Sequence, residues 1–156
     1  MMTNANTDRN SRWITVGAAM VCLAIGLGAW AVHGLEKFIA AQYEGQTKLV
    51  AGQTIPAVAK YVGDFKTAAE YQLSQGLGLV LLGILSQRNR SRSLRVAGMC
   101  LCLGTLLFSG SLYALVLTGV TKLGAITPIG GLLLMIGWGL IAYGACPCRR
   151  CGDEIK

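Results

Sequence analysis

The sequence is short of charged residues. Asp, Glu, Lys and Arg make up only 13% of its 156 residues, about half the share in an ordinary soluble domain, and it has one histidine and three prolines. It lacks a phosphate-binding loop and a Gly-x-Ser-x-Gly element, and its long uncharged runs contain no Asp or Glu. These absences argue against a nucleophilic hydrolase, a nucleotide-binding enzyme and an ion-coupled transporter, since transporters usually carry ionisable groups within the membrane.

Long hydrophobic runs take the place of charge. Hydrophobic residues form 53% of the chain, and the mean hydropathy is +0.53. Two uncharged runs, residues 96–121 and 123–148, are separated only by Lys122, and each exceeds the ~20 residues that cross a ~30 Å hydrocarbon layer. They predict a transmembrane hairpin whose last helix is opened by Thr127 and Pro128, a capping residue followed by a first-turn proline.

Four spans are predicted in all, in a fold that is all-α. The second span is the shortest and is polar where it begins. The first span resembles a secretory signal that would be cleaved after Ala31, but a retained helix is preferred because Trp13 and Trp30 mark both of its ends as interfacial. The predicted spans cover residues 13–32, 71–87, 96–119 and 128–145.

The segment between the first two spans is predicted to hold one or two interfacial amphipathic helices. Apolar residues recur every three or four positions in residues 35–43 and again after Pro56, with a loop at residues 45–53 between them. The second helix either lies in the head-group region or runs straight into the next span. The whole chain then divides into a disordered tail (1–12), a single transmembrane domain (13–145) and a cysteine-containing cytoplasmic tail (146–156).

The positive charge follows the ends of the spans. The net charge of +7 does not gather on one soluble face, so no nucleic-acid partner is predicted. With four spans, nine of the fourteen lysines and arginines fall on one side, and the densest group lies at residues 88–95. The positive-inside rule then places both termini in the cytoplasm of a multi-pass protein, and a bacterial inner membrane is preferred to an organellar one.

Three short motifs resemble a known family. The stretch from Phe108 to Tyr113 (Phe-Ser-Gly-Ser-Leu-Tyr), the Thr-Pro-x-Gly-Gly element that ends at Gly131, and the segment from Gly28 to Leu35 are similar to signatures of the domain-of-unknown-function 423, or transmembrane-protein-256-like, family. The resemblance implies a small four-span membrane protein and no assigned activity. Cleavage after Ala31 would cut the signature that runs from Gly28 to Leu35. Related sequences tend to carry a second histidine where this chain has Gln75.

Polar residues in the outer half of the predicted bundle form a candidate ligand site. His33 is the only histidine and lies at the outer end of the first span, while Gln75 and Tyr113 are expected at matching depth. These groups either line a small pocket for a solute or a lipid head group, or they form interhelical hydrogen bonds. The candidate residues are His33, Gln75, Ser109, Ser111, Tyr113 and Trp138.

The tail cysteines are a candidate metal site. Cys146, Cys148 and Cys151 form half of a zinc or iron–sulfur knuckle, but the chain has no second knuckle to complete four ligands. No cofactor is therefore predicted, and zinc or an iron–sulfur cluster is the alternative to reduced, unliganded thiols.

The leading functional hypothesis is a non-enzymatic structural or accessory component that interacts with lipid, with other membrane proteins or with a second copy of itself. Small residues spaced four apart, such as Ala18, Cys22 and Gly26, favour close helix packing in lipid. The first alternative is a carrier or binder of a small solute or lipid through the outer-half polar cluster. The second alternative is a metal or redox protein that uses the tail cysteines.

Overall fold

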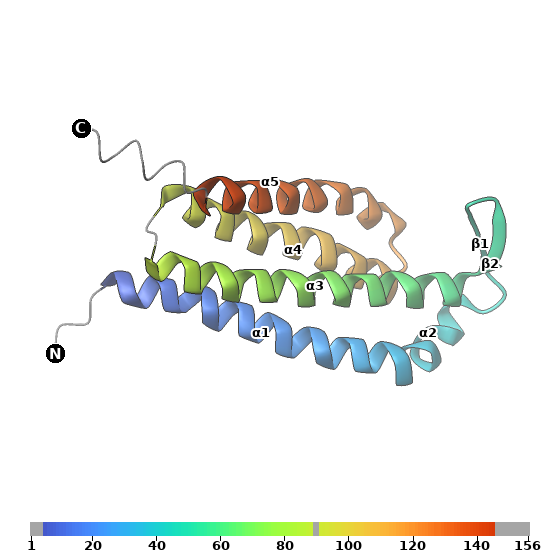
Figure 1. Cartoon of the computed structure of the whole chain (residues 1–156). Coiled ribbons are helices and arrows are strands. Elements are labelled where there is room, and N and C mark those ends of the chain that lie inside the picture. The colour runs from blue at the N-terminus through green and yellow to red at the C-terminus, as the bar shows by residue number, and fades with distance from the viewer. Residues whose placement is uncertain (1–4, 89–90, 146–156) are drawn as a thin grey trace, which may run out of the picture.

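The computed structural model describes residues 5–88 and 91–145. Four long helices run antiparallel to their neighbours in chain order: α1 (Ala5–His33), α3 (Ala57–Arg88), α4 (Arg92–Thr118) and α5 (Thr127–Ala145). Figure 1 shows α3 and α4 between α1 and α5, so each long helix packs mainly on the next one along the chain. The beginning of α1 and the end of α5 lie at the same end of the bundle.

The other end of the bundle carries the short elements. Helix α2 (Leu35–Tyr43) follows α1 directly and buries Leu35, Ile39 and Tyr43. It is followed by strands β1 (Thr47–Val50) and β2 (Gln53–Pro56), and the short 3-10 helix η1 (Thr121–Ala125) connects α4 to α5. The helix predicted at residues 35–43 is thus present.

The antiparallel hairpin of β1 and β2 corrects the prediction of a loop at residues 45–53 and of a purely α-helical fold. Its register pairs Thr47 with Pro56 and Val50 with Gln53. Ala51 and Gly52 form the two-residue turn with φ of 49° and 81°, and positive φ at both positions gives a turn whose twist matches that of paired strands. The turn lacks the Asn-Gly or Asp-Gly pair that usually signals such a hairpin, so the sequence pattern did not reveal it.

Two helix boundaries differ from the sequence prediction. Helix α1 begins at Ala5, inside the segment predicted to be a disordered tail, because no glycine or proline precedes Gly17 to interrupt the helix. Helix α3 begins at Ala57 and continues to Arg88 without a break. The amphipathic segment after Pro56 therefore runs straight into the predicted second span, which is one of the two alternatives that the sequence left open.

Local signals set the ends of α4 and α5. The Ser91 hydroxyl accepts a hydrogen bond from the Ser93 amide at the start of α4. Gly119 ends the helix with φ of 75°, and its amide donates to the Leu115 carbonyl at 2.8 Å. Helix α5 starts at Thr127, one residue before the predicted Pro128, and ends at the predicted Ala145.

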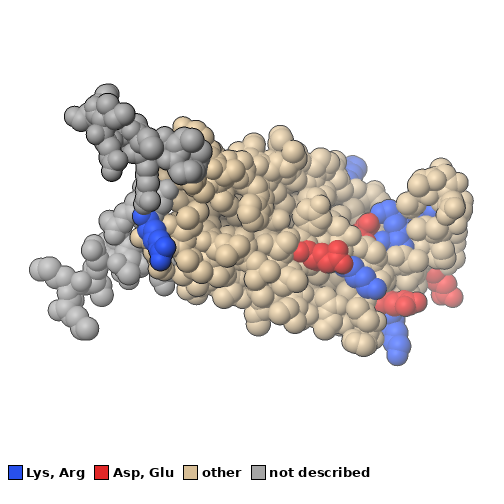
Figure 2. All heavy atoms as spheres, in the orientation of Figure 1, with Lys and Arg blue, Asp and Glu red and all other residues tan. Residues whose placement is uncertain are grey.

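Three helical segments are long and apolar enough to cross a membrane: Arg12–His33, Arg92–Thr118 and Thr121–Ala145. Helix α3 is not among them, so the second of the four predicted spans is not confirmed. Large apolar side chains point outward along the bundle, including Leu23, Leu106 and Met135, each more than 60% exposed. On the face shown in Figure 2, a basic group lies at one end and mixed charges extend from the other end to about the middle, which leaves an uncharged band between them, as expected for a protein surrounded by lipid.

Glycines allow the helices to approach closely. A Cβ atom at Gly17 of α1 would lie 2.6 Å from the carbonyl oxygen of Gly76 of α3, and one at Gly130 of α5 would lie 2.5 Å from the Phe108 amide nitrogen of α4. These contacts leave no room for a side chain, so α1 meets α3 and α5 meets α4 backbone to backbone. The predicted small-residue face of Ala18, Cys22 and Gly26 has the opposite orientation: all three residues are exposed.

Candidate functional site

The predicted polar cluster divides into separate contacts between helices. The indole N–H of Trp138 on α5 donates to Oε1 of the buried Gln75 on α3 at 2.8 Å. Gly78 makes room for the indole ring, since a Cβ atom there would lie 2.9 Å from Trp138 Cζ2. This pair links two helices that are not neighbours in the chain.

The serines and the tyrosine of α4 make other contacts. The Ser111 and Thr127 hydroxyls are 2.9 Å apart, and the Ser111 hydroxyl also donates to the Phe108 carbonyl at 3.0 Å. The Tyr113 ring packs on Phe65 of α3, with ring centroids 4.6 Å apart. The hydroxyls of Ser109 and Tyr113 are buried and have no hydrogen-bond partner among the described residues.

His33 lies far from the contact of Gln75 with Trp138. It is the last residue of α1 and is exposed. Gln75 sits beside the crossing of Gly17 and Gly76, sixteen residues along α1 from His33, which corresponds to ~24 Å of helix. Tyr113 is at the level of Phe65, ten residues or ~15 Å along α3 from Gln75. The structure therefore does not bring His33, Gln75 and Tyr113 together.

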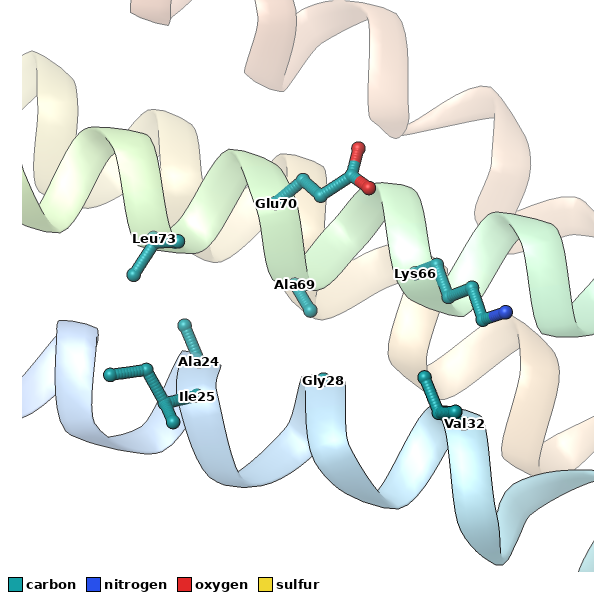
Figure 3. Close-up of a pocket in the computed structure, with 8 residues that line it drawn as sticks. All are labelled: Ala24, Ile25, Gly28, Val32, Lys66, Ala69, Glu70 and Leu73. Atoms are coloured by element: carbon teal, nitrogen blue, oxygen red, sulfur yellow. The ribbon is translucent and has the colours of Figure 1, made fainter.

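A groove between α1 and α3 is a concave site that also carries charged side chains (Figure 3). Its cavity volume is about 290 Å³. Small residues form its floor: Ala24 and Ala69 are buried, and a Cβ atom at Gly28 would still be 3.9 Å from that of Ala69. We call it the α1–α3 groove, and it is lined from α1 by Ala24, Ile25, Gly28 and Val32 and from α3 by Lys66, Ala69, Glu70 and Leu73.

Lys66 and Glu70 are the functional candidates that the sequence analysis missed. Because Glu70 ends the uncharged run, the predicted span began at Tyr71, and no acidic residue was expected beside an apolar helix. In the structure the same helix continues through both charges and holds them opposite Gly28 and Val32 of α1. The signal was the spacing of apolar residues after Pro56, which runs on without interruption into the span.

The two charges act separately at the rim of the groove. Lys66 and Glu70 have the four-residue spacing of a helical ion pair, yet within the described residues no ion pair joins them, in contrast to Lys60 and Asp64 six residues earlier. Figure 3 shows the Lys66 ammonium and the Glu70 carboxylate pointing in different directions. Both side chains are exposed, and the Glu70 carboxylate is directed away from α1, so it reaches the mouth of the groove by rotation of its side chain.

The candidate metal ligands Cys146, Cys148 and Cys151 lie outside the described residues. Within residues 5–88 and 91–145, no group of three or more His, Cys, Asp or Glu side chains is arranged to hold a metal ion. Cys22, Cys100 and Cys102 are free thiols.

Comparison with known proteins identifies the family. The model of the family described as "Protein of unknown function (DUF423)" matches residues 27–131. The chain is 39% identical over 126 residues to the UPF0382 membrane protein SH2409 of Staphylococcus haemolyticus, covering 81% of this chain and 88% of the relative. It is 36% identical over 134 residues to the UPF0382 membrane protein YwdK of Bacillus subtilis, covering 85% and 94%. No solved structure matches the chain. The resemblance seen in the motifs is therefore confirmed, and the chain belongs to the DUF423 family of membrane proteins.

Proposed function

We propose that this protein is a non-enzymatic accessory component of the bacterial inner membrane that associates with another membrane protein, or with a second copy of itself, through the outward face of α1. The proposal includes four spans, with α3 as the second, and both termini in the cytoplasm. The outward face is defined by Ala18, Cys22 and Gly26.

The arrangement of the ends supports the four-span part of this proposal. The start of α1, the end of α3, the start of α4 and the end of α5 lie together at one end of the bundle. The uncharged second half of α3 packs along α1, with Gly76 against Gly17. A helix held backbone to backbone against a membrane-spanning helix shares its depth, so the seventeen uncharged residues of α3 from 71 to 87 belong in the same layer.

The exposed small-residue face of α1 is the observation that supports the proposed association with another membrane protein or a second copy. Where small residues face inward, another helix covers them, as at Gly17 and Gly130. The face of Ala18, Cys22 and Gly26 has the same small-residue character but is exposed, and nothing lies within 4 Å of a Cβ atom at Gly26. Apolar side chains gain little from leaving lipid, so close backbone approach over small residues is the main route by which helices associate there.

Cys22 gives a direct test, because it lies on the proposed interface. In a chain whose other five cysteines are replaced by serine, a short bifunctional maleimide applied to native membranes should yield one discrete adduct containing Cys22. Gly26→Leu should abolish the adduct by separating the backbones. Gly139→Leu is the matched control, since Gly139 is equally open but lies on α5. A chain that gives no adduct and is monomeric by native mass spectrometry after gentle extraction would contradict the proposal.

Binding of a small polar solute is a second candidate function, favoured by one observation. The buried hydroxyls of Ser109 and Tyr113 lie one turn apart on α4 and lack partners among the described residues, and buried polar groups normally have them. A water molecule or a small hydroxylated solute between α3 and α4 would supply both hydrogen bonds. Unchanged solute uptake in a folded Ser109→Ala, Tyr113→Phe double variant would remove this candidate.

A further inference from the structure

We infer that the α1–α3 groove is a binding site for one membrane phospholipid with a zwitterionic head group that ends in a primary ammonium, as in phosphatidylethanolamine. The inference needs α1 and α3 to span the membrane together, as proposed above, but does not depend on association through the outward face of α1. It assigns a ligand class to the charges of Lys66 and Glu70.

The groove opens sideways, toward the surrounding lipid. Its floor is closed, with Ala24 and Ala69 at most 4% exposed, while Ile25 and Val32 on its rim are each 61% exposed. An opening of this kind between two spanning helices faces acyl chains before it faces any soluble ligand. Its volume of about 290 Å³ lies at the lower limit of small-molecule sites, which suits a single hydrocarbon chain.

The deep part of the groove offers nothing to a polar ligand. From Leu73 to the rim, the lining consists of aliphatic side chains and Gly28. Apolar cavities of this type stay dry and take up apolar molecules instead of water. A lipid chain in this part of the groove would cover Leu73 and Ile25 and would fill the space beside Gly28.

The rim sets the identity of the head group. Lys66 provides a cation and Glu70 an anion one turn deeper, ~6 Å along the helix, comparable to the length of a phosphoethanolamine group. The phosphate binds beside the Lys66 ammonium at the outer edge, where the long lysine side chain extends toward water. The Glu70 carboxylate points away from α1 in Figure 3, so this exposed side chain rotates toward the groove to accept hydrogen bonds from the ethanolamine ammonium.

Other common head groups make only some of the contacts that Lys66 and Glu70 offer at the rim. An anionic lipid such as phosphatidylglycerol gains the contact with Lys66 but places its charge near Glu70. A choline head group is cationic but has no N–H to donate to a carboxylate. A choline head group keeps its charge but forfeits the charge-assisted hydrogen bond, and the loss of one such bond corresponds to about tenfold in affinity.

The test is lipid retention by the purified full-length chain. The protein is reconstituted in nanodiscs that contain equal amounts of phosphatidylethanolamine, phosphatidylcholine and phosphatidylglycerol with identical acyl chains, and the lipids that remain bound are measured by native mass spectrometry. The wild type should retain one lipid and should favour phosphatidylethanolamine over phosphatidylcholine by about tenfold. Retention of the three lipids in equal proportion would overturn the inference.

Variants separate the head-group contacts from the groove. Glu70→Gln should remove the preference for ethanolamine over choline, while Lys66→Gln should weaken retention of all three phospholipids. Gly28→Leu should fill the groove and abolish retention, and Gly28→Ala, whose methyl group makes an ordinary contact with Ala69, should fold and reduce it. Controls are Gly26→Leu on the open face of α1 and Glu36→Gln, an exposed acid in α2.

The outcomes distinguish this site from the proposed association of α1. A Glu70→Gln variant that keeps the full ethanolamine preference contradicts the assignment of the rim, even if the Cys22 adduct still forms. A missing Cys22 adduct together with selective retention of phosphatidylethanolamine contradicts the accessory role and leaves the groove assignment intact. If Gly28→Leu lost both the Cys22 adduct and the bound lipid, while Gly28→Ala and Glu70→Gln kept both, the loss would reflect a packing defect. That result would overturn the use of this groove as a lipid site.

Discussion

Tyr43 connects the short helix α2 to the end of α4. Its hydroxyl donates a 2.9 Å hydrogen bond to the Val116 carbonyl, one of the last four carbonyls of α4, which lack partners in their own helix. Tyr43→Phe removes this donor and leaves a buried carbonyl unpaired. We expect the free energy of unfolding to fall by about 1 kcal/mol, measured by denaturant titration in detergent at neutral pH.

The same side chain predicts a pH dependence. Burial, and to a smaller extent the neighbouring Tyr61, raises the pKa of Tyr43 above its ordinary value of 10.0. Above pH 10 the folded state therefore holds this proton more tightly than the unfolded state, and the stabilisation declines as the pH rises through the folded-state pKa. The difference between wild type and Tyr43→Phe should be full below pH 10 and shrink above it. Tyr71→Phe is the matched control, because Tyr71 is partly exposed and only its ring packs, on Phe108.

The contact between Gln75 and Trp138 allows a second residue-scale prediction. Trp138→Phe removes the indole donor from the buried Gln75 side chain and places a smaller ring beside Gly78. Interhelical hydrogen bonds in membranes contribute roughly 0.6–2 kcal/mol. A double-mutant cycle with Gln75→Leu should give a coupling energy in that range, measured by unfolding in detergent. Additive effects would show that the 2.8 Å hydrogen bond contributes nothing to stability.

Sequence analysis predicted the helices that carry the polar residues better than the contacts those residues make. Ser111 and Trp138 lie in α4 and α5, two helices that are long and apolar enough to cross a membrane, whereas α3, which carries Gln75, is not among those helices. Hydropathy carries no information on how far each helix is rotated or which distant helix lies alongside, and the pairing of Gln75 with Trp138 depends on both. Glu70 was missed for a related reason, because a charged residue was taken to end the span. The helix backbone continues through such a residue when its side chain is exposed at the surface.

At the scale of the helix, the crossing of α1 and α3 predicts a difference between two glycines nine residues apart. A Cβ atom at Gly17 would lie 2.6 Å from the Gly76 carbonyl oxygen, so Gly17→Ala forces the two backbones apart. Such overpacking typically lowers stability by about 1–3 kcal/mol. Gly26→Ala adds the same methyl group to the same helix where nothing lies within 4 Å, and should not reduce stability. Equal losses in unfolding titrations of the two variants would contradict the tight crossing.

The elements that were predicted well are those with local signals. Gly119, Thr127 and Pro128 bound α4 and α5 through backbone conformation and capping, which depend on the residues themselves. The hairpin at Ala51 and Gly52 and the continuous helix α3 depend instead on packing. Helix α3 is held along its length by α1 and α4, and this contact outweighs the weak hydropathy and the charges of its first half.

At the scale of the whole molecule, the uncharged band lies between two ends of different character. The end that holds α2, the hairpin and η1 carries acidic and basic side chains together, whereas Arg88 and Arg92 are at the opposite end. The excess of positive charge at that opposite end favours a cytoplasmic location for it. The α1–α3 groove lies nearer the mixed end, so with both termini in the cytoplasm, as proposed, the lipid comes from the leaflet away from the cytoplasm.

Whether α3 spans the membrane decides between a four-span and a three-span arrangement of the chain. Labelling at two exposed positions can distinguish these arrangements. Leu49 lies in β1 and Gln87 at the last turn of α3. If α3 crosses the membrane, Leu49→Cys and Gln87→Cys, each the single cysteine of its chain, lie on opposite sides, and an impermeant maleimide added to intact cells labels only Leu49→Cys. If only the three most apolar segments cross, residues 34–91 all remain on one side, and both cysteines respond alike. The backbone contact of Gly17 with Gly76 makes the first result the expected one, because α1 cannot cross the membrane without carrying the adjacent turn of α3 into the same layer.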